Sequence, residues 1–385
     1  MRIVDVCAFY TPHGGGVKTY AERKLRVAAA QGHEMIVLAP GAEDHVEERA
    51  PDALLATIRA PLLAFDRRYR YFGDEAAVHR ALDRWRPDFV EASSPWSSAS
   101  MVARWRGSAP RALVMHADPL SAYAYRWFGG ITSIATIDRG FDRYWRHLRQ
   151  LDKAFDLVVS ASENLSRRLR NGGLAKVATI PMGVEPGIFS PARRDARVRS
   201  ELLARCGLGD DATLLIGVGR YSPEKRWSMV IDAAIAAGSR APVGLLLIGE
   251  GRQRDRLIAR AGGSPHVIIA PPVRDRDRLA TIMASADALV HGCEAETFCM
   301  VAAEAKASGL RLIVPDRGGA ADHAIAPVDL SYRAADGGAL RDAILAAVTS
   351  GSAIGRWGAP REMDAHFRDL FSAYGALTGG MSAAA

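Results

Sequence analysis

Short runs of β-branched and other apolar residues alternate with longer stretches of helical spacing in the first part of the chain. The expected elements are a strand at 2–6, a glycine turn at 14–16, a helix at 17–30 and a strand at 35–39. This order makes a βαβ unit, which implies a parallel sheet with helices on both faces. Further strands are expected at 89–92, 112–115, 157–160 and 177–181.

A second alternating series follows a connector at 181–194 that is rich in proline and glycine. Its expected strands lie at 214–219, 244–249, 267–269, 288–291 and 311–314, and its expected helices at 227–237, 252–261, 278–285 and 300–308. The two series predict an α/β fold class with two Rossmann-like doubly wound domains that face a central cleft. A final helix is expected at about 360–377, because apolar residues share one face there.

The composition is that of a globular protein and agrees with more than one domain. The chain has 385 residues, of which 49% are hydrophobic and 24% charged. No apolar run approaches the roughly 18 residues of a spanning helix, and Asp5 interrupts the first apolar run, so we expect neither a membrane span nor an export signal. The four cysteines fit no disulfide framework and no paired zinc spacing, which favours the cytoplasm.

The charge balance is basic, with 50 Lys and Arg against 43 Asp and Glu, a net charge of +7. Such a surplus suits nucleic acid, an acidic membrane face or a phosphorylated ligand, although a basic surface without a partner is common. Two segments at 65–72 and 123–146 mix arginines with aromatic residues. They are typical of a membrane interface, of packing under extended arginines or of base stacking, and the sequence leaves these three alternatives open.

Two glutamates with seven residues between them mark the strongest candidate site. Glu296 falls in the loop after the expected strand at 288–291, and Glu304 falls inside the following helix. The backbone N–H groups that start this helix can bind an anion, while the two carboxylates can hold hydroxyl groups. The alternative is a pair of solvated surface glutamates.

A second candidate is the loop at 217–225, which follows the first strand of the second series and carries Arg220 and Lys225. Two cations at the carboxyl edge of a sheet suit a diphosphate, although a charged surface loop has the same appearance. Gly249 ends the next strand and would let a ligand approach the backbone.

The first series carries weaker signals. Gly15 and Gly16 precede its first helix and can admit a phosphate or sugar, although a simple tight turn has the same composition. His116 closes a strand and can donate a hydrogen bond to a sugar hydroxyl, but a lone histidine is usually structural. The run 275–277 has a D-x-D pattern that is better explained as a helix N-cap, and no residue set suggests a metal site.

Taken together, these segments resemble the retaining glycosyltransferases of family four, which have the two-Rossmann (GT-B) architecture. Segment 296–309 looks like the E-x7-E signature of that family, and 218–225 is similar to its donor-phosphate loop. The interdomain passage at 180–191, Asp287 and the segment 316–319 match in the same order. The chain departs from the pattern at Cys299, where the family usually has glycine, and a side chain there would either crowd the sugar or restrict the loop.

The resemblance implies a nucleotide-diphosphate sugar donor, of the GDP-mannose or UDP-glucose type, and retaining hexose transfer without a metal ion. Arg220 and Lys225 would then neutralise the diphosphate, and Glu304 would bind the ribose. The groups expected around the transferred hexose and its phosphate are Glu296, the amides of Phe298, Cys299 and Met300, the glycines Gly15 and Gly16, and His116. Gly249 is expected beside them in the donor site.

The resemblance also implies a division of the chain. Residues 1–190 would form an acceptor-side domain, 191–355 a donor-binding domain, and a helix at 356–377 would cross back onto the first. The expected acceptor is a glycan or a lipid-linked sugar, with the protein held peripherally on the inner face of the membrane. A sugar-nucleotide epimerase or hydrolase on the same fold, and a nonenzymatic nucleic-acid-binding protein, are the alternatives.

Overall fold

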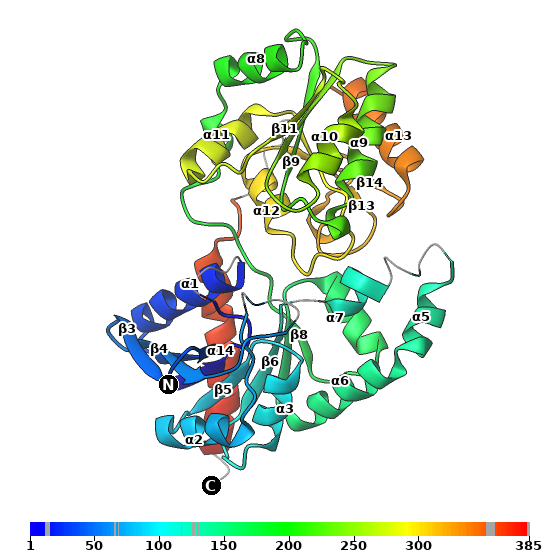
Figure 1. Ribbon diagram of the computed structural model, residues 1–385. Coiled ribbons are helices and arrows are strands. Elements are labelled where there is room, and N and C mark those ends of the chain that lie inside the picture. The colour runs from blue at the N-terminus through cyan, green and yellow to red at the C-terminus, as the bar shows by residue number, and fades with distance from the viewer. Residues whose placement is uncertain are drawn as a thin grey trace. The chain divides into compact units, whose positions relative to one another are not determined.

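The computed structural model describes residues 1–11, 16–64, 67, 69–116, 118–124, 128, 131–351 and 359–382. The contacts divide the chain into two units (Figure 1). Unit 1 comprises Met1–Asp118, Ile131–Pro181 and Asp364–Ala385, and unit 2 comprises Pro119–Gly130 and Met182–Met363. By this division the chain changes unit after residues 118, 130, 181 and 363. Val184 and Phe189, which precede the expected boundary at 190, are buried in the core of unit 2.

The described strands of unit 1 form one sheet in the order β3-β4-β2-β1-β5-β6-β7-β8. Their bounds are β1 (Arg2–Val6), β2 (Glu34–Gly41), β3 (His45–Ala50), β4 (Ala53–Arg59), β5 (Phe89–Ala92), β6 (Arg111–Met115), β7 (Leu157–Ser160) and β8 (Val177–Thr179). All pairs are parallel except β3 with β4. Strands β3 and β4 were not predicted: β3 is an exposed, charged edge strand without an apolar run, whereas β4 does carry an apolar run that was overlooked.

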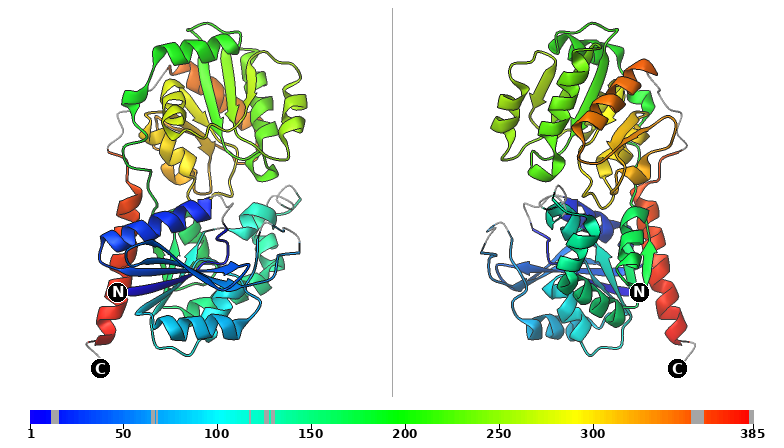
Figure 2. Two further views of the ribbon diagram at one scale, coloured as in Figure 1. Left: turned by 60° about the vertical axis from the view of Figure 1, so that its left-hand side comes forward. Right: turned by 90° about the vertical axis from the view of Figure 1, so that its right-hand side faces the viewer.

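The helices of unit 1 cover both faces of this sheet (Figure 2). They are α1 (Gly16–Ala30), α2 (Glu75–Trp85), α3 (Ser97–Arg104), α5 (Ile134–Gly140), α6 (Asp142–Ala154), α7 (Glu163–Asn171) and α14 (Met363–Ser382). The strand order reverses direction at β1, and right-handed crossovers then place α1 and α3 on opposite faces.

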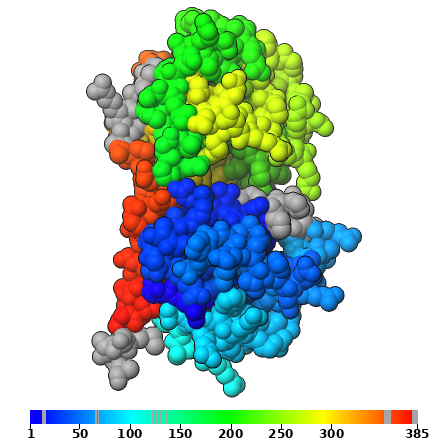
Figure 3. Space-filling view, turned by 90° about the vertical axis from the view of Figure 1, so that its left-hand side faces the viewer, coloured from blue at the N-terminus to red at the C-terminus, as the bar shows by residue number. Residues whose placement is uncertain are grey.

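Helix α14 packs beside α1 in unit 1, as the red and blue surfaces of Figure 3 show. Its Phe367 contacts the ring of Tyr20, and its Tyr374 stacks on Phe89 with ring centroids 4.0 Å apart. The helix starts at Met363, later than expected from the sequence. The preceding backbone is extended because the Val184 N–H donates to the Arg361 carbonyl oxygen and the Val184 carbonyl accepts from Met363.

Unit 2 contains an entirely parallel sheet, whose described strands have the order β11-β10-β9-β12-β13-β14. Their bounds are β9 (Thr213–Val218), β10 (Val243–Ile248), β11 (Val267–Ala270), β12 (Ala288–Val290), β13 (Arg311–Pro315) and β14 (Leu330–Tyr332). The helices are α8 (Ala196–Arg205), α9 (Trp227–Gly238), α10 (Arg254–Ala261), α11 (Arg276–Ser285), α12 (Met300–Ala307) and α13 (Gly337–Thr349).

Two apolar layers enclose this second sheet. Residues of α9, α10 and α13 bury one face, and residues of α8, α11 and α12 bury the other. The α/β fold class with two parallel-sheet domains is thereby confirmed. Among the described residues, no helix is both long and apolar enough to cross a membrane.

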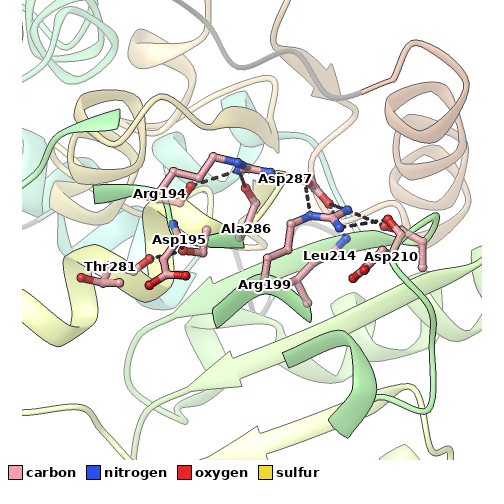
Figure 4. A network of polar contacts seen from close by, with 11 residues as sticks. Arg194, Asp195, Arg199, Asp210, Leu214, Thr281, Ala286 and Asp287 are labelled. Carbon is pink, nitrogen blue, oxygen red and sulfur yellow. Dashed lines mark hydrogen bonds and ion pairs between the residues drawn. The ribbon is translucent and has the colours of Figure 1, made fainter. Parts of the chain in front are cut away.

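Asp287, one of the positions that carried the resemblance, joins α8 and its connector to the sheet of unit 2 (Figure 4). The Arg199 Nη2 donates to its Oδ2 at 2.8 Å, and the Arg194 Nη2 donates to its Oδ1 at 3.1 Å. The backbone N–H of Leu214, in β9, donates to the same carboxylate at 2.9 Å. These bonds satisfy a buried charge, so Asp287 supports the fold rather than the site.

Candidate functional site

The candidate site lies where the strand order of unit 2 reverses. β9 pairs with β10 on one side and with β12 on the other. The chain leaves β9 toward α9 and leaves β12 toward α12, so the loops that follow these two strands meet at the carboxyl edge of the sheet. In open α/β sheets this reversal point is where ligands bind.

Close packing against the neighbouring loop shapes the loop after β9. The buried Tyr221 places its hydroxyl 2.7 Å from the Ala270 carbonyl oxygen, and its N–H donates to Glu250 O at 2.7 Å. A Cβ at Gly249 would lie 1.9 Å from the Gly219 carbonyl oxygen, so only glycine fits there. The close backbone approach expected at Gly249 is therefore made by the protein's own loop.

The two cations of this loop differ in their surroundings. Lys225 ends the short 3₁₀ helix η3 (Pro223–Lys225), and only 14% of its side chain is exposed. Its ammonium forms an ion pair with Glu296 Oε1. The Arg220 side chain is 78% exposed and lies 3.4 Å from Glu224. The structure thus joins Lys225 to the Glu296 loop and leaves Arg220 facing solvent.

Glu296 is held as a carboxylate. Burial by itself would raise its pKa, but the Lys225 ammonium and His291 together outweigh burial and hold the pKa of Glu296 well below its usual range. Burial by itself would lower the pKa of Lys225, but the Glu296 carboxylate and the nearby Cys293 and Cys299 together outweigh it and raise that pKa. The two charges therefore stabilise each other.

His291 follows β12 and is a site residue that the sequence analysis missed. Its Nε2 lies 3.4 Å from Glu296 Oε1 and 3.6 Å from Cys299 Sγ. Burial lowers the pKa of His291, although the hydrogen bond with Glu296 opposes this effect. The available signal was its position at the carboxyl end of a strand, the same criterion that selected His116.

The start of α12 carries the three amides expected near the hexose. Cys299 precedes the helix with φ of 67°, in the left-handed region that favours glycine. The ring of Phe298 meets the ring of His323 edge-on, with centroids 4.6 Å apart. Met300 begins the helix, in which the Ala302 N–H already donates to the Cys299 carbonyl oxygen at 3.0 Å, so the N–H groups of Met300 and Val301 are the ones without an intrahelical acceptor. The glycine expected at 299 would fit this backbone better than cysteine does.

Glu304, on α12, pairs with Arg276 rather than with the cations of the β9 loop. The Arg276 Nη2 donates to Glu304 Oε1 at 2.7 Å, and the Arg276 Nε lies 3.4 Å from Glu185. Burial raises the pKa of Glu304, and Arg276 opposes this effect. Arg276 was also missed, because the run 275–277 was interpreted only as a helix cap. That cap is confirmed: Asp275 accepts from the N–H groups of Asp277 and Arg278.

Donor atoms of His291, Glu296 and Cys299 lie within 4.8 Å of one another, which is the kind of cluster that can hold a metal ion. Lys225 already places an ammonium on the same Glu296 oxygen. Burial raises the pKa of the Cys299 thiol well above its ordinary value, so the sulfur is a neutral thiol and a poor ligand. These side chains fit an ammonium better than a metal, and the expectation of metal independence stays a prediction.

The remaining expected residues belong to unit 1. His116 follows β6 and contacts the Tyr20 ring edge-on at 4.7 Å between centroids. Burial and the nearby Lys24 lower the pKa of His116 to about 4. Gly16 is the exposed first residue of α1. Gly15 lies outside the described residues.

Two family models match the chain. The model described as Glycosyltransferase Family 4 matches residues 14–187, and the model described as Glycosyl transferases group 1 matches residues 199–346. Among curated relatives, a GDP-mannose-dependent alpha-(1-6)-phosphatidylinositol dimannoside mannosyltransferase of Mycobacterium tuberculosis is 29% identical over 82% of this chain and 79% of its own length. A GDP-mannose-dependent alpha-mannosyltransferase of Corynebacterium glutamicum is 25% identical over 88% of this chain and 76% of its own length.

Solved structures share the fold. Sucrose-phosphate synthase from Thermosynechococcus elongatus superposes with a TM-score of 0.72 at 20% identity, and both chains are covered completely. Anabaena Alr3699/HepE in complex with UDP-glucose superposes with a TM-score of 0.63 at 17% identity, again over both whole chains. At these identities the likeness establishes the architecture alone.

Proposed function

We propose that this chain, which belongs to glycosyltransferase family four and has the GT-B architecture, transfers a mannosyl group from GDP-mannose to a hydroxyl of a lipid-linked glycan, with retention of anomeric configuration. The observation that carries the proposal is the ion pair between Lys225 and Glu296 at the reversal point of the unit 2 sheet. The mannosyltransferases among the relatives support the choice of donor.

The two members of this ion pair have complementary tasks. The Lys225 ammonium would bind the diphosphate and stabilise the charge that grows on it as the sugar leaves. Glu296, held ionised, would accept hydrogen bonds from mannose hydroxyls. Arg220 is exposed and unconstrained enough to close over the outer face of the diphosphate. Glu304, oriented by Arg276, would accept from the ribose hydroxyls.

The acceptor hydroxyl would attack from the face that the diphosphate leaves, and a departing phosphate oxygen would take the hydroxyl proton. No protein base is then required. A metal ion would be dispensable because Lys225, Arg220 and the first-turn amides of α12 supply positive charge. A chelator should accordingly leave the transfer rate unchanged, and restoration of a lost rate by Mg²⁺ would contradict this part of the proposal.

A membrane-associated acceptor is supported by apolar side chains exposed on unit 1, among them Trp96, Tyr71 and Ile131, the last with 84% exposure. Parts of the arginine–aromatic segments serve packing instead, because Phe72 and Trp145 are buried. Ile131→Asp should weaken sedimentation with anionic liposomes. Ile258→Asp, at an exposed isoleucine of α10 in unit 2, is the matched control.

A ligand panel tests the donor directly. Thermal unfolding is followed with GDP-mannose, UDP-glucose, GDP and UDP, since a ligand at 100 times its Kd adds about 2.7 kcal/mol of stability. We expect stabilisation by GDP-mannose and GDP and transfer of mannose to a phosphatidylinositol-mannoside acceptor. Stabilisation by the uridine nucleotides alone would overturn the choice of donor. Rapid conversion of the donor to an epimer or free sugar without acceptor would indicate an epimerase or hydrolase.

A further inference from the structure

The Glu296 carboxylate has two polar contacts among the described side chains. One is the ammonium of Lys225, and the other is Nε2 of His291 at 3.4 Å from Oε1. In the proposed function, on which this inference rests, Lys225 also binds the diphosphate. A single ammonium that turns to a diphosphate with two negative charges loosens its hold on the carboxylate. The histidine is then the contact that remains.

His291 is held firmly enough to keep that contact. Its side chain is fully buried. Its backbone N–H donates to the Ile313 carbonyl oxygen at 2.9 Å, and its carbonyl accepts from the Tyr332 hydroxyl at 2.8 Å. The Trp227 ring meets the imidazole edge-on, at 89° between planes. Strands β13 and β14 and the α9 helix therefore limit its motion.

The chemistry of its neighbours selects one tautomer. An ionised carboxylate only accepts hydrogen bonds, so the imidazole nitrogen that faces Glu296 must carry the proton. The other nitrogen, Nδ1, is buried and has no hydrogen-bond partner among the described residues. A neutral ring with its proton on Nε2 satisfies the contact that matters to Glu296 and leaves Nδ1 as an unprotonated acceptor.

We infer that His291 is a positioning residue, whose Nε2–H holds Glu296 Oε1 so that Oε2 stays directed at the hexose when Lys225 binds the diphosphate. The position of Glu296 would then depend on Lys225 before the donor binds and on His291 afterwards. This role can be distinguished from a packing role by measurement. Loss of the His291 contact should weaken the affinity for the sugar-bearing donor, whereas it should leave the affinity for the nucleotide alone unchanged.

The test compares the binding of GDP and GDP-mannose to three variants by calorimetry. His291→Gln keeps an N–H close to the position of Nε2, His291→Asn moves it to the position of Nδ1, and His291→Leu removes it. We expect the Leu and Asn variants to bind GDP-mannose at least about tenfold more weakly with GDP affinity unchanged, and to lose kcat in parallel. The Gln variant should recover to within about threefold of the wild type.

Equal weakening of GDP and GDP-mannose in the Leu and Asn variants would reveal a structural role and overturn the inference. Unchanged affinity for both ligands would overturn it as well. If His291→Leu does not fold, the comparison of Gln with Asn still decides, since both are polar and similar in size. Failure of the wild-type protein itself to bind GDP-mannose would contradict the proposed function instead.

Discussion

Each unit contains a lysine paired with carboxylates near the carboxyl edge of its parallel sheet, and the two pairs differ in burial and in partners. In unit 1, the fully buried Lys24 ammonium lies 3.0 Å from Asp5 and 2.5 Å from Glu91. Ser93 and Tyr374 complete this cluster, with the Tyr374 hydroxyl donating to Glu91 at 2.6 Å. In unit 2, the described partner of Lys225 is the single carboxylate of Glu296, and both side chains retain some exposure.

The difference indicates which lysine is structural. Lys24 joins β1, β5 and, through Glu91 and Tyr374, the returning helix α14, so any exchange of partners would leave a buried charge unpaired. Burial and the adjacent Glu91 carboxylate raise the pKa of Asp5, which shows how crowded that cluster is. Lys225 joins two loops at a sheet reversal, and exchange of its carboxylate for a phosphate would leave Glu296 in contact with His291.

The largest expected effect comes from Lys24→Met. The variant leaves two buried carboxylates without their cation, and the free energy of unfolding should fall by about 3–5 kcal/mol. Urea denaturation measures it. The matched variant Lys225→Met should lose less, because it leaves one carboxylate rather than two without its cation, and Glu296 keeps its contact with His291. Equal losses in the two variants would remove the distinction between the pairs.

The second effect is on activity. Lys225→Ala should lower kcat/KM for mannosyl transfer by at least about tenfold, or 1.4 kcal/mol, because it removes charge stabilisation from the leaving diphosphate. Arg260→Ala is the control, since Arg260 also pairs with a carboxylate, Asp232, on the surface of unit 2. A wild-type rate in Lys225→Ala would contradict the role assigned to this lysine.

Arg220→Ala should also lower kcat/KM, by about tenfold, and by less than the change at Lys225. The exposed Arg220 side chain must lose conformational freedom when it binds the donor, and this entropic cost reduces the transition-state stabilisation that it contributes. The free energy of unfolding should not change. Steady-state kinetics at several donor concentrations gives kcat/KM for both variants. A larger loss of kcat/KM in Arg220→Ala than in Lys225→Ala would contradict the greater importance assigned to Lys225.

The last effect concerns pH. The pKa of His116 is lowered to about 4 from 6.5, so the unfolded chain binds a proton between these values that the folded chain does not. This contribution to stability is complete above pH 6.5 and is lost as the pH falls toward 4, by up to about 1.4 kcal/mol for each pH unit. His116→Gln should flatten the pH dependence of urea unfolding in that window. An unchanged slope would show that His116 is not the group responsible.

Much of the fold could be predicted from local patterns. The buried strands β1, β5, β9 and β13 are short β-branched or leucine-rich runs, and the expected strands fall on them. Strand β3 carries exposed charged residues, and its pairing with β4 depends on a neighbour rather than on its own composition. The start of α14 was missed for a similar reason, since its preceding residues pair with Val184 far away in the chain.

The chain's own residues were enough to nominate Lys225, Glu296, Cys299 and Glu304, because residue type, glycine spacing and the position after a strand are local properties. Which of them meet was decided by the tertiary structure. Lys225 and Glu296 are 71 positions apart and come together only because β9 pairs directly with β12. Burial lowers the pKa of His291, and Glu304 pairs with Arg276 of another helix. Neither effect could be predicted from local sequence, because both arise only when distant segments pack together and exclude water.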